Sequence, residues 1–93
     1  MTDTEVLRKN EVQRGEEAER LLTNPLFLSA MQDVEDRLIK TMKAVNLNDK
    51  ETHSRLVTAL WVADQVRGAI RRHIETGKLA RKELSMRQPP WRF

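Results

Sequence analysis

The stretch 44–52, AVNLNDKET, decides the architecture, because it ends one long amphipathic segment and begins another. Asn48 and Glu51 have the spacing of a capping box, and Asp49 adds a negative charge near the start of the second segment. Helices joined by so short a connection pack as antiparallel neighbours. The sequence therefore predicts an all-α fold built on an antiparallel hairpin of two long amphipathic helices.

The first arm of this hairpin begins in TNPLF, residues 23–27. Asn24 is a favourable N-cap, and Pro25 is tolerated at the first helical position, where its missing N–H costs nothing. Apolar side chains then recur at intervals of three and four residues as far as Val45, with charged residues between them. This pattern predicts a helix of about twenty residues, roughly 30 Å long.

The second arm is expected over residues 49–76, where one apolar stripe extends from Leu56 to Ile74. Gly77 follows this stripe, and Arg71, Arg72 and His73 precede it, as is typical of a helix C-terminus. We therefore interpret Gly77 as a C-cap.

Shorter helices are expected on both flanks of the hairpin. One covers residues 15–22 or extends back toward Thr4, which leaves open whether residues 1–14 are flexible. Another covers 78–86, before Pro89 and Pro90 favour an extended chain. The prediction is a single helical domain, residues 1–86, followed by an extended C-terminal tail, residues 87–93, RQPPWRF.

Composition limits the function classes. A chain of 93 residues without cysteine has neither disulfide nor thiolate metal site to supplement a small core. The longest uncharged run, LLTNPLFLSAMQ at 21–32, is too short to cross a bilayer, as is the apolar run TALWVA at 58–63, so no membrane role is expected. A soluble intracellular protein is the resulting expectation.

Charge is distributed unevenly along the chain. Residues 1–54 contain eight Lys/Arg and eleven Asp/Glu, a net charge of −3, whereas residues 55–93 contain nine and three, a net charge of +6. Such a gradient suits self-association, nucleic acid or an acidic protein partner. Composition does not choose among them.

No residues are assigned to catalysis, to a cofactor or to a metal. His53 and His73 lie twenty residues apart on one expected helix, about 30 Å, so they cannot share a ligand within one chain. The acidic clusters have basic residues at helical spacing, as on a solvated helix face. We expect a protein that is not an enzyme and has no small-molecule substrate.

The basic half offers a nucleic-acid surface as one hypothesis. Its candidate contacts share helical spacing that could present positive charge to phosphates: Arg67, Arg71, Arg72, Lys78, Arg81 and Lys82. The alternative is that these cations only solvate the outer helix face or complement acids on a neighbouring helix or subunit.

Protein contact is the leading hypothesis, and Trp61 is its centre. Trp61 and Val57 lie at i,i+4 on a face offset from the apolar stripe, so one hairpin partner does not cover them. The first or last short helix is one candidate cover, and another subunit is the other. In the tail, Trp91, Arg92 and Phe93 are residue types enriched in interface hot spots and predict a docking peptide; folding of the tail back over Trp61 is the alternative.

The segments RGEEAERLLTNPLF, DVEDRLIKTM and IRRHIETGKLA together resemble a group of small helical proteins encoded by tailed bacteriophages, in the part of the genome for virion structure and assembly. The resemblance covers roughly residues 14–80 and implies a non-enzymatic component located in the virion or the host cytoplasm. The expected function is thus a structural or interaction protein that self-associates or docks on a larger complex. A nucleic-acid-binding or DNA-packaging accessory is the alternative, and inhibition of a host enzyme is also left open.

Overall fold

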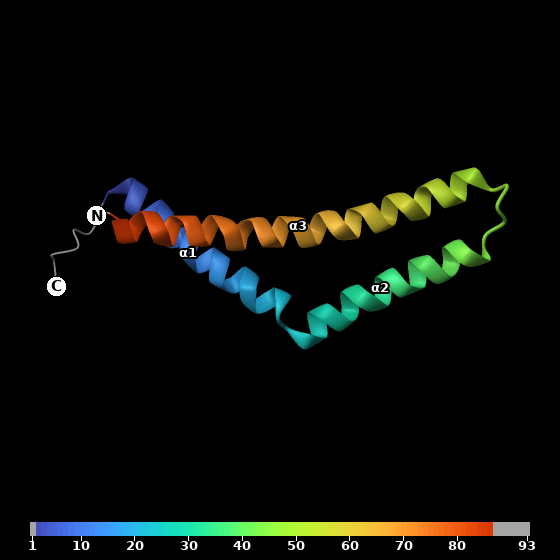
Figure 1. Cartoon of the computed structure of the whole chain (residues 1–93), viewed down its shortest axis with the longest axis horizontal. Coiled ribbons are helices and arrows are strands. Elements are labelled where there is room, and N and C mark those ends of the chain that lie inside the picture. The colour runs from blue at the N-terminus through green and yellow to red at the C-terminus, as the bar shows by residue number, and fades with distance from the viewer. Residues whose placement is uncertain (1, 87–93) are drawn as a thin grey trace. The chain divides into compact units, whose positions relative to one another are not determined.

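The computed structural model describes residues 2–86, which form three helices: α1 (Asp3–Leu22), α2 (Pro25–Ala44) and α3 (Lys50–Met86) (Figure 1). Turns at 23–24 and 45–49 connect them, and these described residues include no strand. The predicted all-α class is confirmed for this part of the chain. Residues 87–93, the predicted tail, lie outside the described residues.

The start of α2 follows from its capping residue. Asn24 has extended backbone angles, and its Oδ1 accepts from the amides of Leu26 and Phe27 at 2.9 and 3.1 Å. Pro25 takes the first helical position, where no amide is needed. The helix that follows is 20 residues long, as the spacing predicts.

The start of α3 differs from the prediction, because Asp49 caps it and Asn48 does not. The Thr52 amide donates to Asp49 Oδ1 at 3.1 Å, and the Thr52 hydroxyl donates to Asp49 Oδ2 at 2.7 Å. These two hydrogen bonds, first that of the hydroxyl and then that of the amide, lower the pKa of the Asp49 carboxyl. The Asn48 amide instead donates to Oδ1 of Asn46 at 2.9 Å, which fixes the turn.

The longer of the two alternatives for the first helix is observed, since α1 begins at Asp3. Thr2 supports this start, because its hydroxyl oxygen accepts from the Glu5 amide at 3.2 Å. Arg8, one turn further on, is anchored by the carboxylates of Glu11 and Glu83 at 2.7 and 2.5 Å. Residues 3–14 are therefore part of the helical fold.

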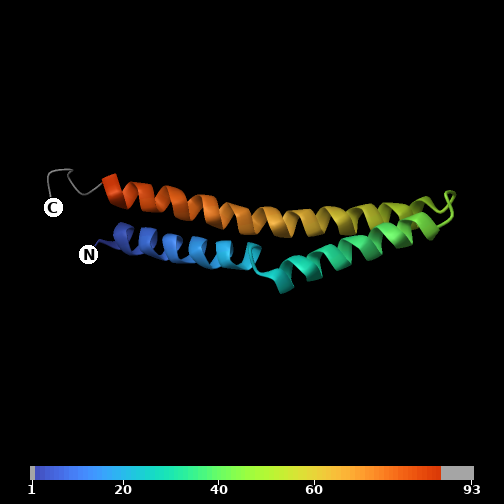
Figure 2. The same ribbon diagram turned by 60° about the horizontal axis from the view of Figure 1, so that its bottom comes forward.

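The chain divides into two compact units. Of the described residues, 2–21 and 69–86 belong to unit 1, and Leu22–Gly68 form unit 2. In unit 1, α1 lies beside the C-terminal part of α3 and runs in the opposite direction; in unit 2, α2 does the same with the N-terminal part of α3 (Figures 1 and 2). Each unit is thus a pair of helical segments.

The interpretation of Gly77 as a C-cap is wrong, as is the separate helix over 78–86, because α3 continues through Gly77 to Met86. Gly77 is buried against Gly15 of α1. A Cβ atom on Gly77 would lie 3.0 Å from both the Glu11 carbonyl oxygen and the Gly15 Cα, and a Cβ on Gly15 would lie 2.9 Å from the His73 carbonyl oxygen. The two glycines permit close approach of two helix backbones.

The core of both units is thin. Among residues 2–86, the buried hydrophobic side chains are only those of Ala18, Ala63 and Ala80, and no large side chain is fully buried. The apolar stripes of α2 and α3 are half-buried at Phe27, Leu38, Leu56 and Leu60, but Val34 and Val66, which were expected on the same stripes, are exposed. Packing between paired helices therefore covers only part of the apolar surface.

Candidate interaction site

Val57 and Trp61 lie on α3 within unit 2, and both side chains are exposed. Their exposed fractions are 56% for Val57 and 59% for Trp61. Each follows a half-buried stripe residue, Leu56 or Leu60, by one position, which rotates it about 100° away from α2. A tryptophan left exposed to this extent on a rigid helix is a typical interface anchor.

Unit 2 exposes further large apolar side chains on α2, on α3 and in the turn between them. Unit 2 exposes nine large hydrophobic residues in all: Leu26, Leu28, Val34, Ile39, Leu47, Val57, Trp61, Val62 and Val66. Of these nine, only Val57 and Trp61 were predicted from the sequence as contacts. Leu26, Leu28, Ile39 and Val62 carry the same signal, a one-residue offset from a stripe position. Val34 and Val66 were expected within the stripes but are exposed, and Leu47 lies in the turn between α2 and α3.

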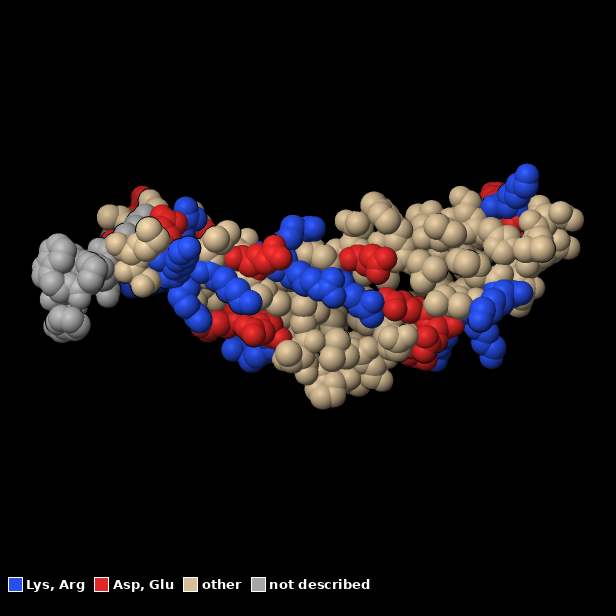
Figure 3. Space-filling model, viewed as in Figure 1, with Lys and Arg blue, Asp and Glu red and all other residues tan. Residues whose placement is uncertain are grey.

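Unit 2 also has no net charge, since residues 22–68 contain six Lys/Arg and six Asp/Glu. Figure 3 shows mainly uncharged surface over the N-terminal part of α3, whereas acidic and basic side chains alternate over the helices of unit 1. Exposed apolar side chains on a neutral surface favour contact with protein.

The six candidate nucleic-acid contacts do not form one set. Arg67 belongs to unit 2, where it pairs with Glu35 of α2; the side-chain exposures of this pair are 22% and 17%. Arg81 belongs to unit 1 and pairs with Glu16 of α1. Both are thus used in helix pairing, as the alternative hypothesis for the basic residues proposed.

The other four candidates are exposed on α3 in unit 1: Arg71, Arg72, Lys78 and Lys82. Within residues 2–86, none of these four forms an ion pair with a carboxylate. Arg71, Lys78 and Lys82 follow each other by seven and four residues, so they share one face over about 16 Å. These three exposed cations are the part of the predicted basic surface that is not used in pairing the helices.

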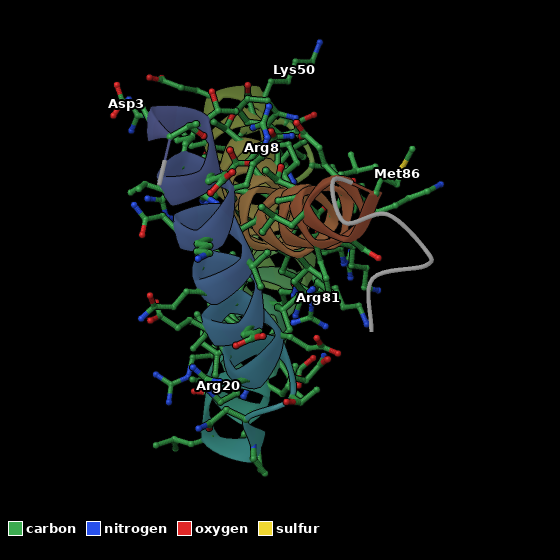
Figure 4. All side chains as sticks on the ribbon, turned by 90° about the vertical axis from the view of Figure 1, so that its left-hand side faces the viewer. Asp3, Arg8, Arg20, Lys50, Arg81 and Met86 are labelled. Atoms are coloured by element: carbon green, nitrogen blue, oxygen red, sulfur yellow. The ribbon has the colours of Figure 1, made fainter. Side chains whose placement is uncertain are left out.

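Two ion-pair contacts join α1 to α3 in unit 1. Arg8 of α1 pairs with Glu83, and Arg81 of α3 pairs with Glu16; Figure 4 labels both arginines. Hydrogen bonds to Glu11 and then Glu83 raise the pKa of the Arg8 guanidinium above its ordinary value. Arg8 thus bridges one carboxylate of its own helix and one of α3.

The described residues hold no group of three or more His, Asp or Glu side chains that suits a metal ion. A shallow hollow of about 220 Å³ in unit 1 is lined by Arg14, Glu17, Ala18, Leu21, Ile70 and His73. It is smaller than the roughly 300–1,000 Å³ of ordinary ligand pockets. No helix within residues 2–86 combines the length and the apolar character that a membrane span requires.

The three tail residues predicted to bind a partner, Trp91, Arg92 and Phe93, lie outside the described residues. The exposed apolar surface of unit 2 is therefore the best-defined candidate site of the described chain. Comparison of the chain with protein-family models, with curated proteins and with solved structures found no match in any of the three.

Proposed function

We propose that this chain is a non-enzymatic structural or interaction protein that self-associates or docks on a larger assembly, as a small component of a tailed-phage particle. Its framework is an antiparallel hairpin of amphipathic helices, and its contacts are Val57 and Trp61 on α3 together with Trp91, Arg92 and Phe93 in the tail. The assignment to a phage particle rests on the sequence resemblance over residues 14–80.

One observation supports an interaction role above the others. Among residues 2–86, fourteen large hydrophobic side chains are exposed, while only three alanines make up the buried hydrophobic core. Burial of apolar area is the main source of stability, at about 25 cal/mol per Å². A chain with so much of this area left in water gains stability from a partner.

The first test is the absolute mass of the purified chain by light scattering behind a sizing column, at low and moderate salt. A discrete multimer at both salts is expected for apolar self-association, because salt screens charges and not apolar contact. A monomer at both salts would exclude self-association and make the proposal depend on a larger partner.

The particle itself provides the second test. The chain is expected in purified virions of a phage that encodes it, where mass spectrometry would detect it. Replacing Trp91 and Phe93 by alanine should reduce incorporation without changing helicity by circular dichroism. Virions that lack the chain would contradict a structural role in the particle.

A DNA- or RNA-binding accessory is the second candidate function, supported by the exposed stripe of Arg71, Lys78 and Lys82. It predicts affinity that falls steeply with salt, because each neutralised phosphate releases counterions. Charge reversal of these three residues should abolish binding, with reversal of the paired Arg55 as the matched control. Absence of binding at low salt would exclude this candidate.

A further inference from the structure

We infer that unit 2 has two opposite apolar sides, and that one side binds the other side of a second copy of this chain. This inference rests on the proposed function and specifies its partner. It follows from the positions of the exposed side chains relative to the half-buried stripes of α2 and α3.

The first group, side A, consists of residues that each follow a half-buried or buried stripe position by one. Leu28 and Ile39 follow Phe27 and Leu38 on α2, and Val57 and Trp61 follow Leu56 and Leu60 on α3. One residue corresponds to about 100° of helical rotation. Two antiparallel helices are related by a twofold axis perpendicular to the plane that contains them. Side chains that are rotated by the same angle from the contact line, one on each helix, therefore lie on the same side of the pair. Side A is therefore one surface formed by both helices.

The second group, side B, consists of residues that precede a half-buried or buried position by one, whether this position is apolar or, as at Glu35 and Arg67, part of the ion pair between α2 and α3. On α2 these are Leu26 and Val34, before Phe27 and Glu35; on α3 they are Val62 and Val66, before Ala63 and Arg67. The same geometry places them together on the opposite side of the helix pair. Their exposed fractions are 79% for Leu26, 48% for Val34 and Val62, and 44% for Val66.

The existence of two apolar sides selects the mode of contact. A dimer joined through side A alone would leave all of side B in water. Contact between side A of one copy and side B of the next covers both with a single kind of interface, and such a heterologous contact builds rings or longer arrays.

Charge and size both suit a second copy as the occupant. Because residues 22–68 have no net charge, two copies meet there without net repulsion. The side of a helix pair about 30 Å long and 20 Å wide covers on the order of 600 Å² in projection, close to the roughly 800 Å² that each partner buries in a standard interface.

The test uses the full chain with one charge placed on each side. Trp61→Glu blocks side A, Val66→Glu blocks side B, and Leu79→Glu, at an exposed position of unit 1, is the matched control. Light scattering is expected to give a multimer of more than two copies for the wild type and the control. Each single variant should be monomeric, with at least about a tenfold weaker association, because a charge is costly to bury without a partner.

Mixing the two variants gives the decisive result. A one-to-one mixture of Trp61→Glu and Val66→Glu should form a dimer and nothing larger, since the intact side A of one variant meets the intact side B of the other. Dissociation by Trp61→Glu alone, with Val66→Glu still assembled, would indicate contact of side A with itself and overturn the inference. So would a monomeric wild type.

Two further variants protect the test against misfolding. Val57→Glu on side A and Val62→Glu on side B should repeat the pattern, and circular dichroism should report wild-type helicity for each. A monomeric chain that nevertheless enters virions would overturn this inference and leave the proposed function standing. A chain that assembles as described but is absent from virions would support this inference and contradict the proposed role in the phage particle.

Discussion

At Gly77, α3 lies so close to the backbone of α1 that little room is left for a side chain. Ala at this position would gain about 1 kcal/mol of helix propensity over Gly. Its Cβ would, however, lie 3.0 Å from two backbone atoms of α1, and overpacking costs about 1–3 kcal/mol.

We expect Gly77→Ala to lower the free energy of unfolding by up to about 2 kcal/mol, because backbone atoms cannot move aside as a side chain can and the overpacking outweighs the gain in helix propensity. Chemical denaturation followed by circular dichroism measures this change. Thr76→Ala, at the exposed neighbouring position, should instead leave stability unchanged or raise it slightly. Stabilisation by Gly77→Ala would contradict the close approach.

Asp49 gives a prediction in pH. Its pKa is lowered by hydrogen bonds from Thr52, so its contribution to stability is present above the ordinary Asp pKa of about 3.9 and is lost as pH falls through the lower folded value. The melting temperature of Asp49→Ala should therefore lie below that of the wild type at pH 7, and the difference should shrink in acid. A difference that is constant from pH 7 to pH 2 would show that the carboxylate does not cap α3.

The residue scale also marks where sequence reasoning succeeds and fails. Asn24 and Pro25 are predictable because their roles are local and depend only on the next three residues. Gly77 is not, because a C-cap and a close helix contact both require glycine, and only the position of Gly15 distinguishes them. Asn48 and Asp49 are both favourable N-caps in adjacent positions, and α3 begins at Lys50, so the Asp49 carboxylate accepts from Thr52 while the Asn48 amide donates to Asn46.

At the scale of elements, the pairing of α2 with α3 includes one well-covered ion pair, Arg67 with Glu35. An exposed pair on one helix, Arg55 with Glu51, has 76% exposure of both side chains and lies at 2.6 Å. Exposed i,i+4 pairs contribute about 0.3–0.5 kcal/mol, whereas less solvated pairs are screened less.

A double-mutant cycle with Arg67→Ala and Glu35→Ala should give a coupling energy of about 1 kcal/mol. The matched cycle with Arg55→Ala and Glu51→Ala should give about 0.3–0.5 kcal/mol, and added salt should reduce it further. Urea denaturation of the four variants in each cycle measures both values. A coupling energy near zero for Arg67 and Glu35 would mean that they do not pair across the helices, and a value equal to that of Arg55 and Glu51 would mean that their burial adds nothing.

The elements themselves were predictable where apolar spacing repeats without interruption, as in α2. The prediction failed at the end of α3, because a glycine in an otherwise helical segment signals a stop more often than a crossing point. It was incomplete for α1, whose apolar residues are few and whose pairing depends on Arg8 reaching Glu83 in a distant part of the sequence.

For the whole molecule, self-association would make thermal stability depend on protein concentration. Because assembly binds only folded chains, a tenfold higher concentration stabilises the folded state by up to about 1.4 kcal/mol per subunit. The melting temperature should therefore rise by a few degrees over that range for the wild type. Trp61→Glu should melt at one temperature across the same range, and a wild type that does so as well would speak against assembly.

The candidate site was partly predictable at this scale. Trp61 and Val57 were found because they lie off the apolar stripe, and both are exposed. For the basic residues two hypotheses were left open, because sequence spacing does not reveal that Glu35 pairs with Arg67 and Glu16 with Arg81. Such pairings join helices that are distant in sequence and depend on which helix faces which.

The alanine and glycine contacts of the described chain have a consequence for how its sequence can drift. In most small proteins, truncating a large interior side chain is the harmful change, but here the interior positions are already the smallest residues. Enlargement at Gly15, Ala18, Ala63, Gly77 or Ala80 is the step that selection would remove. A library of all single substitutions other than proline should therefore lose folded variants mainly at these five positions, while the large exposed side chains are retained only when the selection requires assembly.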